Sequence, residues 1–320
     1  MIAPLPAYAG CSARNKEQAA VGEITRIAVV QTRWLGSRAA MKDEYRDLVA
    51  QAAHGGAALV CLPELSLSPY FPARPDPSGF DWAEPLDGGE SALCFSELAR
   101  VNAVTLIGSL FEKADDGIFR NTAVIYGPDG QRLGLTRKVH IPSGEGYHET
   151  DFFVGGTEYP VHDLDGLPTA VPTCYDQWFP ELARIYALNG AAFIFYPTAI
   201  GSEPTDPSMD SQDAWRTVMR GHAIANGVYV AAANRTGAEN GLTFYGGSFI
   251  CAPTGEIIAQ AGRDTREVLF ADLDLALMRH WRGLFPLLHQ RKPQVYGRIV
   301  EQTSTDVPSR WRDHPAFVED

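Results

Sequence analysis

The sequence predicts an α/β fold in which helices cover β-sheets within a single domain. Segments with the periodicity of strands and of amphipathic helices alternate in both halves of the chain, with strand pairs between them. No shift in composition marks a linker, and no segment repeats at a fixed period. At 320 residues, the chain can bury the core of one large domain. We therefore expect one domain over residues 24–300, a flexible leader over 1–23 and a C-terminal tail over 301–320.

The first half of the chain alternates buried strands with amphipathic helices. Strands are predicted at 24–31, 57–63, 104–113, 119–130 and 132–140, and helices at 37–56 and 90–103. In the first helix, apolar residues from Met41 to Val49 share one face, and Gly55 and Gly56 mark its end. The turn signal Pro128-Asp129-Gly130 joins the last two strands.

The second half repeats this pattern. Strands are predicted at 158–166, 169–173, 191–197 and 227–235, and a helix at 211–226. A further helix begins at Pro180, whose ring suits the first helical turn, and ends at Gly190. Residues 243–261 are typical of a hairpin that turns at Pro253-Thr254-Gly255.

Charge and composition exclude several classes of protein. The net charge of −12, with no basic run, disfavours binding to nucleic acid or to an anionic membrane surface. No apolar stretch approaches the roughly 20 residues of a transmembrane helix. The first residues lack the basic region of an export signal and carry Pro4 and Pro6. We expect a cytoplasmic protein.

Cysteine and histidine spacing gives no sign of a metal site. The five cysteines are Cys11, Cys61, Cys94, Cys174 and Cys251. They are odd in number and contain no CxxC pair, so neither a disulfide framework nor a zinc–thiolate site is indicated. The eight histidines show no HExxH spacing. We expect no metal and no cofactor.

Three chemically active residues lie where predicted strands end. Cys174 lies between an extended segment and a helix, whose N-terminal dipole favours a thiolate. Glu64 directly follows the apolar strand ending at Pro63, and Lys138 lies at the end of another strand. Taken singly, each fits a structural role: a buried core cysteine, a cap or turn glutamate, an exposed edge lysine.

Taken together, the three residues form a complete set for acyl transfer. A thiol nucleophile needs a base to accept its proton, and a carboxylate can serve. The tetrahedral intermediate needs a fixed positive donor, which a lysine beside a backbone N–H supplies. The sequence therefore predicts nucleophile, base and oxyanion donor, provided that the fold brings Cys174, Glu64 and Lys138 together.

Three segments resemble the signature blocks of the nitrilase superfamily of carbon–nitrogen hydrolases. They are "LPELSLSPYF", "RKVHIPSGEGYHE" and "CYDQWFPELARIYALNGAAFIFYPTAIGSEP", and the likeness runs from about Ile24 to about Arg298. The resemblance implies a four-layer αββα sandwich of the nitrilase type that forms homodimers or larger homo-oligomers. It places the family's catalytic triad on Glu64, Lys138 and Cys174. It adds Glu149 as a substrate-positioning carboxylate.

The same resemblance implies an oxyanion hole made by Lys138 and the backbone N–H of Tyr175. Around the nucleophile, "DQWFPE" is similar to the N-carbamoylputrescine amidases. D-Amino-acid N-carbamoylases carry two arginines where this chain has Gln177 and Trp178, so a substrate with an α-carboxylate is disfavoured. An aromatic wall in an acidic protein suits a cationic amine tail. We thus expect Tyr175, Gln177 and Trp178 to position the substrate, a small N-carbamoyl or amide compound.

The implied reaction is hydrolysis of an N-carbamoyl amine to amine, carbon dioxide and ammonia through a thioester. Pro172-Thr173, Ile224, Gly247 and the segment 277–293 depart from the branch and leave the substrate's tail open. β-Ureidopropionase, ω-amidase and nitrilase are alternatives with the same triad. A protease-like pairing of Cys174 with His222 or His140, and a catalytically silent binding protein, are further alternatives.

Overall fold

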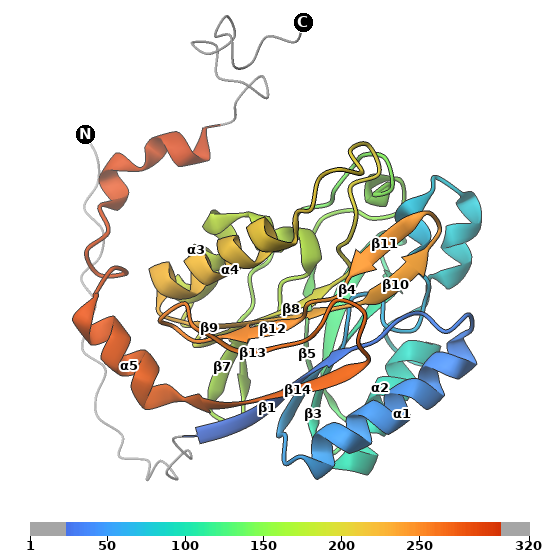
Figure 1. Ribbon diagram of the computed structural model, residues 1–320, viewed down its shortest axis with the longest axis horizontal. Helices are drawn as coiled ribbons and strands as arrows, with labels where there is room; N and C mark the ends of the chain where they lie inside the picture. The colour runs from blue at the N-terminus through green and yellow to red at the C-terminus, as the bar shows by residue number, and fades with distance from the viewer. Residues whose placement is uncertain (1–23, 302–320) are drawn as a thin grey trace, which may run out of the picture.

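The computed structural model describes residues 24–301, and Figure 1 shows two β-sheets face to face between two pairs of helices. The predicted leader and the predicted tail beyond residue 301 lie outside the described residues. Within 24–301, every helix is too short or too polar to cross a membrane. The four layers confirm the predicted αββα sandwich.

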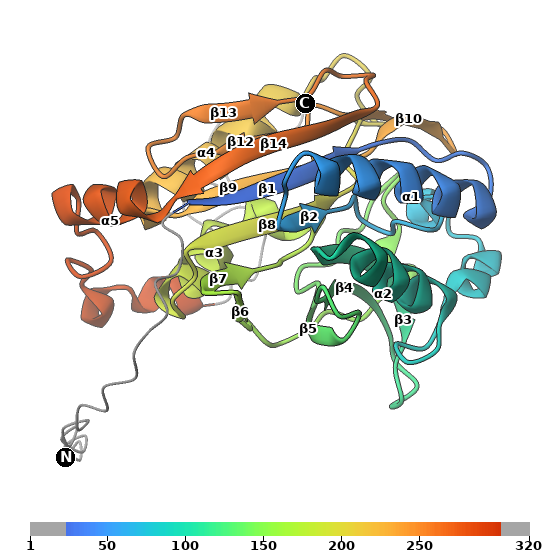
Figure 2. The same ribbon diagram turned by 90° about the horizontal axis from the view of Figure 1, so that it is seen from below.

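The first sheet has the strand order β14-β1-β2-β3-β4-β5. Its strands are β1 (Ile24–Gln31), β2 (Leu59–Cys61), β3 (Thr105–Lys113), β4 (Phe119–Tyr126), β5 (Arg132–Arg137) and β14 (Glu267–Asp274). The neighbouring strands β1, β2 and β3 run parallel. Strand β14 pairs antiparallel with β1, and β4 pairs antiparallel with both β3 and β5. Helices α1 (Arg38–His54) and α2 (Glu90–Asn102) cover the outer face, side by side in Figure 2.

The second sheet has the order β13-β12-β9-β8-β7-β6. Its strands are β6 (His162–Leu164), β7 (Leu167–Ala170), β8 (Phe193–Thr198), β9 (Tyr229–Asn234), β12 (Phe249–Cys251) and β13 (Ile257–Gln260). Strands β7, β8 and β9 run parallel. Helices α3 (Pro180–Leu188) and α4 (Gln212–Asn226) pack on its outer face.

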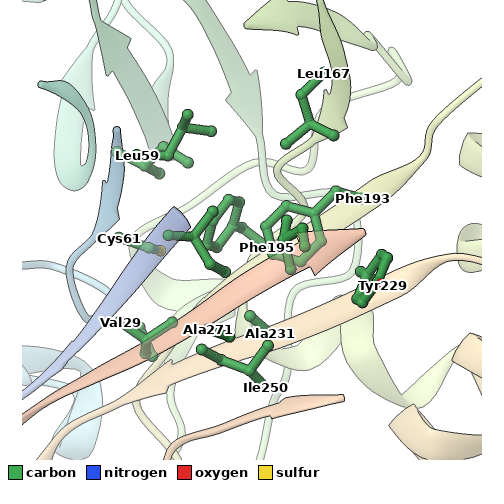
Figure 3. Packing of buried hydrophobic residues seen from close by; sticks show 14 of the residues in the cluster. Val29, Leu59, Cys61, Leu167, Phe193, Phe195, Tyr229, Ala231, Ile250 and Ala271 are labelled. Carbon is green, nitrogen blue, oxygen red and sulfur yellow. The ribbon is translucent and has the colours of Figure 1, made fainter. Parts of the chain in front are cut away.

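Alternation along each strand explains why both faces of each sheet are apolar. In β1, Val29 points between the sheets, whereas Ala28 and Val30 point toward α1 and α2. Figure 3 shows Phe193 and Phe195 of the second sheet packed near Leu59 and Cys61 of the first. This contact between the sheets fixes the strand ends relative to each other, and the site is built from those ends.

The smaller elements complete the fold. A two-stranded sheet is formed by β10 (Thr236–Glu239) and β11 (Leu242–Tyr245), and helix α5 (Leu275–Leu284) follows β14. Short 3₁₀ helices occupy Phe71–Ala73, Pro77–Trp82, Glu149–Asp151, Cys174–Trp178, Pro293–Val295 and Gly297–Val300.

The structure differs from the sequence prediction at the hairpin over 243–261. The turn at residues 253–255 is confirmed, because β12 and β13 pair across it. Residues 243–245, however, belong to β11 and pair with β10. Gly246 and Gly247 separate the two strands with φ angles of 52° and 66°, a left-handed conformation that breaks a strand and favours glycine. Strand β14 and helix α5 lie in a part of the chain for which no element was predicted.

Candidate active site

Three strand ends bring the predicted triad together. Glu64 lies after β2, Lys138 directly after β5, and Cys174 after β7 in the second sheet. All three side chains are buried, with Cys174 the most accessible at 6 %. The Lys138 Nζ lies 2.9 Å from Glu64 Oε1. Glu64 and Lys138 are therefore in contact, and both are close enough to Cys174 for their charges to act on its thiol.

The Glu64 carboxylate has one occupied oxygen and one free oxygen. Its Oε1 accepts hydrogen bonds from Lys138 Nζ at 2.9 Å and from Asn121 Nδ2 at 2.7 Å. Its Oε2 is buried and has no hydrogen-bond partner among the described residues. A buried acceptor without a partner is costly, so this oxygen is available for a proton from the thiol, from water or from substrate.

The ammonium group of Lys138 lies between the carboxylates of Glu64 and Glu149. Its Nζ donates to both oxygens of Glu149, at 2.9 and 2.7 Å, as well as to Glu64. Burial alone lowers the pKa of Lys138, but the charges of Glu149 and Glu64 outweigh burial and raise the pKa above its ordinary value. Lys138 is therefore a fixed cation, as an oxyanion donor must be.

Glu149 has a second partner besides Lys138. The Tyr70 hydroxyl donates a hydrogen bond of 2.7 Å to Glu149 Oε1. Burial raises the pKa of Glu149 above its ordinary value, while Lys138 opposes this shift and Glu64 adds to it. Lys138 and Tyr70 therefore hold the Glu149 carboxylate in place. Tyr70 lies in the loop after Glu64 and was not singled out from the sequence, although it belongs to the first block that resembles the nitrilase superfamily.

Cys174 occupies a strained turn at the start of the 3₁₀ helix. Its φ angle is 41°, a left-handed conformation that costs a non-glycine residue roughly 1–3 kcal/mol. Asp176 holds this turn: its Oδ2 accepts from Thr173 N at 3.2 Å and its Oδ1 accepts from His140 N at 2.8 Å. These bonds tie the nucleophile's turn to the chain that follows Lys138.

The surroundings of the thiol differ from the sequence expectation. A helix N-terminus was expected to favour the thiolate. Instead, burial and then the Glu64 carboxylate raise the pKa of Cys174 well above its ordinary value, and Lys138 opposes them only in part. The Sγ lies 3.6 Å from the carbonyl oxygen of Ala199, to which the neutral thiol donates. Cys174 consequently needs a base, and its pKa responds to the charge of Glu64.

A cavity of about 540 Å³ opens above Cys174. Cys174 and Glu149 lie on its wall together with Tyr175 and Trp178. The remaining lining residues are Pro142, Ser143, Gly144, Glu145, Tyr147, Ala199, Ile200, Glu203, Pro204 and Thr205. Its size suits a small molecule. Two carboxylates on this wall, Glu145 and Glu203, were not singled out from the sequence, although both lie inside the blocks that resemble the nitrilase superfamily.

The structure does not bring Gln177 to this cavity. Gln177 is fully buried, its Oε1 accepts from Thr198 Oγ1 at 3.3 Å, and it is absent from the lining residues. The short helix turns Tyr175 and Trp178 outward and Gln177 inward, a rotation that spacing alone could not predict. Gln177 therefore lies in the protein interior, against Thr198 of β8, and not against the cavity.

Neither histidine of the protease-like alternative lines the cavity with Cys174. His222 is buried, its Nε2 lies 2.8 Å from the carbonyl oxygen of Gln177, and burial lowers its pKa. The ring of His140 stacks on Phe179 at 3.6 Å between centroids and contacts Asp176. Both histidines thus have structural partners.

Residues 26–283 match the carbon–nitrogen hydrolase family. The chain belongs to this family. It is 38% identical to a citrullinase of Francisella tularensis over 282 residues, which cover 87% of this chain and 98% of that protein. It is 41% identical to an N-carbamoylputrescine amidase of Solanum lycopersicum over 258 residues, covering 78% of this chain and 86% of that protein.

A solved relative supports the same assignment. The crystal structure of a carbon–nitrogen hydrolase from Helicobacter pylori is 35% identical and has a TM-score of 0.83, covering 87% of this chain and 99% of the other. The resemblance found in the sequence motifs is therefore confirmed. This carbon–nitrogen hydrolase is an amidohydrolase with the fold of the nitrilase superfamily.

Proposed function

We propose that this carbon–nitrogen hydrolase cleaves the ureido group of an N-carbamoyl amine with a cationic tail, such as N-carbamoylputrescine, to amine, carbon dioxide and ammonia. The observation that carries the proposal is the charge of the cavity wall. Glu145 and Glu203 lie on this wall together with Glu149, and no lysine or arginine is among the described residues that line it. A positively charged tail is attracted to such a wall, and a substrate carboxylate is repelled.

The first half of the proposed reaction forms a thioester. Glu64 accepts the Cys174 proton at its free oxygen, and the sulfur attacks the ureido carbonyl carbon. Lys138 and the backbone N–H of Tyr175 stabilise the oxyanion that develops on the carbonyl oxygen. When the intermediate collapses, the C–NH₂ bond breaks and Glu64 returns the proton, so that ammonia leaves.

The second half regenerates the enzyme. Glu64 accepts a proton from water, whose oxygen attacks the thioester, and the C–S bond breaks with return of the proton to sulfur. The released N-alkyl carbamic acid decomposes to carbon dioxide and the free amine. Glu149 holds Lys138 in place and offers its carboxylate to the ureido nitrogen. None of these steps uses a metal or a cofactor.

The cationic tail has three partners in this proposal. Glu203 accepts a hydrogen bond of 3.1 Å from Ser211, which fixes one of its oxygens. Glu145, more exposed, adds negative charge nearby. The indole of Trp178 offers a π-face to an ammonium group, a contact worth roughly 0.5–2 kcal/mol.

Citrulline is the second candidate substrate. The observation that favours it is the 38% identity to a citrullinase over nearly all of that protein's length. Citrulline carries the same ureido group, with an α-amino group and an α-carboxylate at the other end. The acidic wall suits the α-amino group, but the described residues that line the cavity include no lysine or arginine for the carboxylate. We therefore expect citrulline to be a poorer substrate than an N-carbamoyl amine without a carboxylate.

We also propose a homodimer or a larger homo-oligomer. The support is a group of exposed apolar side chains at the end of α5, where Leu284 is 58 % exposed and Phe285 48 % exposed. Burying such side chains against a second copy removes apolar surface from water. Light scattering on the purified protein measures the mass directly, and a strictly monomeric mass would contradict this part of the proposal.

The experiment is ammonia release over a panel of substrates, with Cys174→Ala as the control. The panel contains N-carbamoylputrescine, citrulline, N-carbamoyl-β-alanine, a simple ω-amide and an aliphatic nitrile. We expect the highest kcat/KM for N-carbamoylputrescine and no release by the control. Preference for citrulline or N-carbamoyl-β-alanine would overturn the assignment of the tail. Turnover only of the ω-amide or the nitrile would overturn the ureido assignment.

A further inference from the structure

Arg235 is a buried arginine that the reaction scheme leaves without a role. It follows β9, is 4 % exposed and does not line the cavity. Its Nη1 donates to both carboxylate oxygens of Glu239, at 2.8 and 2.9 Å. Its Nη2 donates to three backbone carbonyls, of Glu64 at 2.9 Å, Leu65 at 3.0 Å and Ser68 at 3.2 Å.

The three carbonyls belong to the loop that presents Glu64. Leu65 has a φ angle of 48°, so the chain takes a strained left-handed turn directly after Glu64. Such a turn persists only when its surroundings hold it, and the guanidinium of Arg235 binds the carbonyls on both sides of it. The direction in which the Glu64 side chain leaves the backbone therefore depends on Arg235.

The ion pair between Arg235 and Glu239 also holds the other end of the loop that begins at Glu64. The backbone N–H of Tyr70 donates to Glu239 Oε2 at 2.8 Å, and the Tyr70 hydroxyl donates to Glu149. Arg235 and Glu239 thus fix a segment that carries Glu64 at its start and the partner of Glu149 at its end. Both carboxylates that hold Lys138 depend on this one segment.

The position of Arg235 links the two halves of the site. Glu64 follows β2 in the first sheet, and Cys174 follows β7 in the second, so base and nucleophile come from different sheets. Arg235 follows β9, which belongs to the second sheet. The adjacent Asn234 holds the chain beside the nucleophile: its side chain donates to Ile200 O and accepts from Ile200 N, both at 3.0 Å.

We propose that Arg235, oriented by Glu239, is a positioning residue that aims the free oxygen of Glu64 at the Cys174 thiol. The proposal rests on the proposed function, because it assumes that Glu64 is the base. A base works only within hydrogen-bond reach of its proton, and a misplacement of about 1 Å can cost roughly 10²-fold in rate. Lysine cannot replace arginine here, since three carbonyls and a carboxylate require the planar fork of donors.

The test is the rate at which iodoacetamide alkylates Cys174, resolved by peptide mass spectrometry. This readout needs the thiol and its base but no substrate. The four proteins are the unmodified chain, Glu64→Gln, Arg235→Lys and the double variant. Arg282→Lys is the matched control, because Arg282 also donates to backbone carbonyls, of Gly227 and Ala191, but lies away from the site.

We expect Glu64→Gln to slow alkylation, because the loss of the base outweighs the fall in the Cys174 pKa that removal of the Glu64 charge brings. Arg235→Lys should slow alkylation by about tenfold or more. In the Glu64→Gln background, Arg235→Lys should have almost no further effect, because the group that it positions is gone. Arg282→Lys should leave the rate unchanged. Equal relative losses from Arg235→Lys in both backgrounds would overturn the proposal while leaving the base assignment intact. An unchanged rate in Glu64→Gln would overturn the base assignment as well.

Glu239→Gln tests the same proposal if Arg235→Lys fails to fold. It keeps the shape of the side chain and weakens the hold on Arg235. We expect a smaller loss in the same direction, absent in the Glu64→Gln background. With any substrate that the enzyme turns over, kcat should fall while KM changes by less than about threefold, since Arg235 does not line the cavity. A variant with normal kcat per folded molecule would contradict a positioning role.

Discussion

Replacing Glu203 by glutamine tests how the cavity selects its substrate. The change removes one negative charge from the wall and keeps the shape of the side chain, including an acceptor for Ser211. It should weaken recognition of a cationic tail and leave the chemistry at Cys174 untouched. The comparison uses two substrates of equal length: N-carbamoylputrescine, and pentylurea, in which a methyl group replaces the ammonium.

The magnitude follows from the setting of the carboxylate. Two unit charges about 4 Å apart attract by about 4 kcal/mol at an effective dielectric constant of about 20. Glu203 is half-buried, so solvent screening reduces this to about 1–2 kcal/mol. Since about 1.4 kcal/mol corresponds to tenfold, kcat/KM for N-carbamoylputrescine should fall by about 5–30-fold. For pentylurea it should stay within about twofold.

The assay is ammonia release at low and at high salt. The loss on N-carbamoylputrescine should shrink at about 0.5 M salt, because added ions screen a partly exposed pair. Glu145→Gln is the comparison variant: its carboxylate is exposed, so its effect should be smaller, at most about 1 kcal/mol. An equal loss on both substrates, or no loss on either, would refute the role of Glu203 in binding the tail.

Three further outcomes follow from the structure. Lys138→Met should lower kcat by about 10²–10³-fold, as the loss of an oxyanion donor does. It should also lower the midpoint of thermal unfolding, because Glu64 and Glu149 lose their cation. A near-normal kcat would contradict the role of Lys138 as the oxyanion donor. Phe195→Ala should lower the free energy of unfolding by roughly 3–5 kcal/mol in urea titrations, since the ring is fully buried between the sheets; a loss below about 1 kcal/mol would refute that packing. Burial lowers the pKa of His222 in the folded chain below its ordinary value of about 6.5. As the pH falls below about 6.5, His222 therefore binds a proton in the unfolded chain before it does so in the folded chain, and the free energy of unfolding decreases. His222→Gln should reduce this decrease, and an unchanged pH slope would contradict it.

Local pattern was enough to predict most of the two sheets and all four flanking helices. The strand at 24–31 was predicted to the residue, and the helices begin within one residue of their expected starts. Strand β14 was missed, although its apolar residues Val268 to Leu273 were a readable signal. The hairpin error came from Gly246 and Gly247, which adopt left-handed conformations and donate backbone hydrogen bonds to Arg235 and Gly262, residues outside the predicted strand pair.

The candidate site was predictable where chemistry and motif coincide. Glu64, Lys138 and Cys174 could be assigned to one site because each belongs to a block that resembles the family. The inward rotation of Gln177 could not, because it depends on the geometry of a five-residue 3₁₀ helix. The contact of Arg235 with Glu64 joins residues 171 positions apart, and no local pattern encodes such a partner. The raised pKa of Cys174 likewise depends on tertiary burial.

The most direct test of the central claim is the mass of the peptide that contains Cys174, taken from enzyme quenched in acid during turnover of N-carbamoylputrescine. If Cys174 attacks the ureido carbonyl, this peptide gains the mass of the substrate less ammonia, and Cys174→Ala releases no ammonia. Ammonia release by Cys174→Ala, or an adduct on a different residue, would contradict the account.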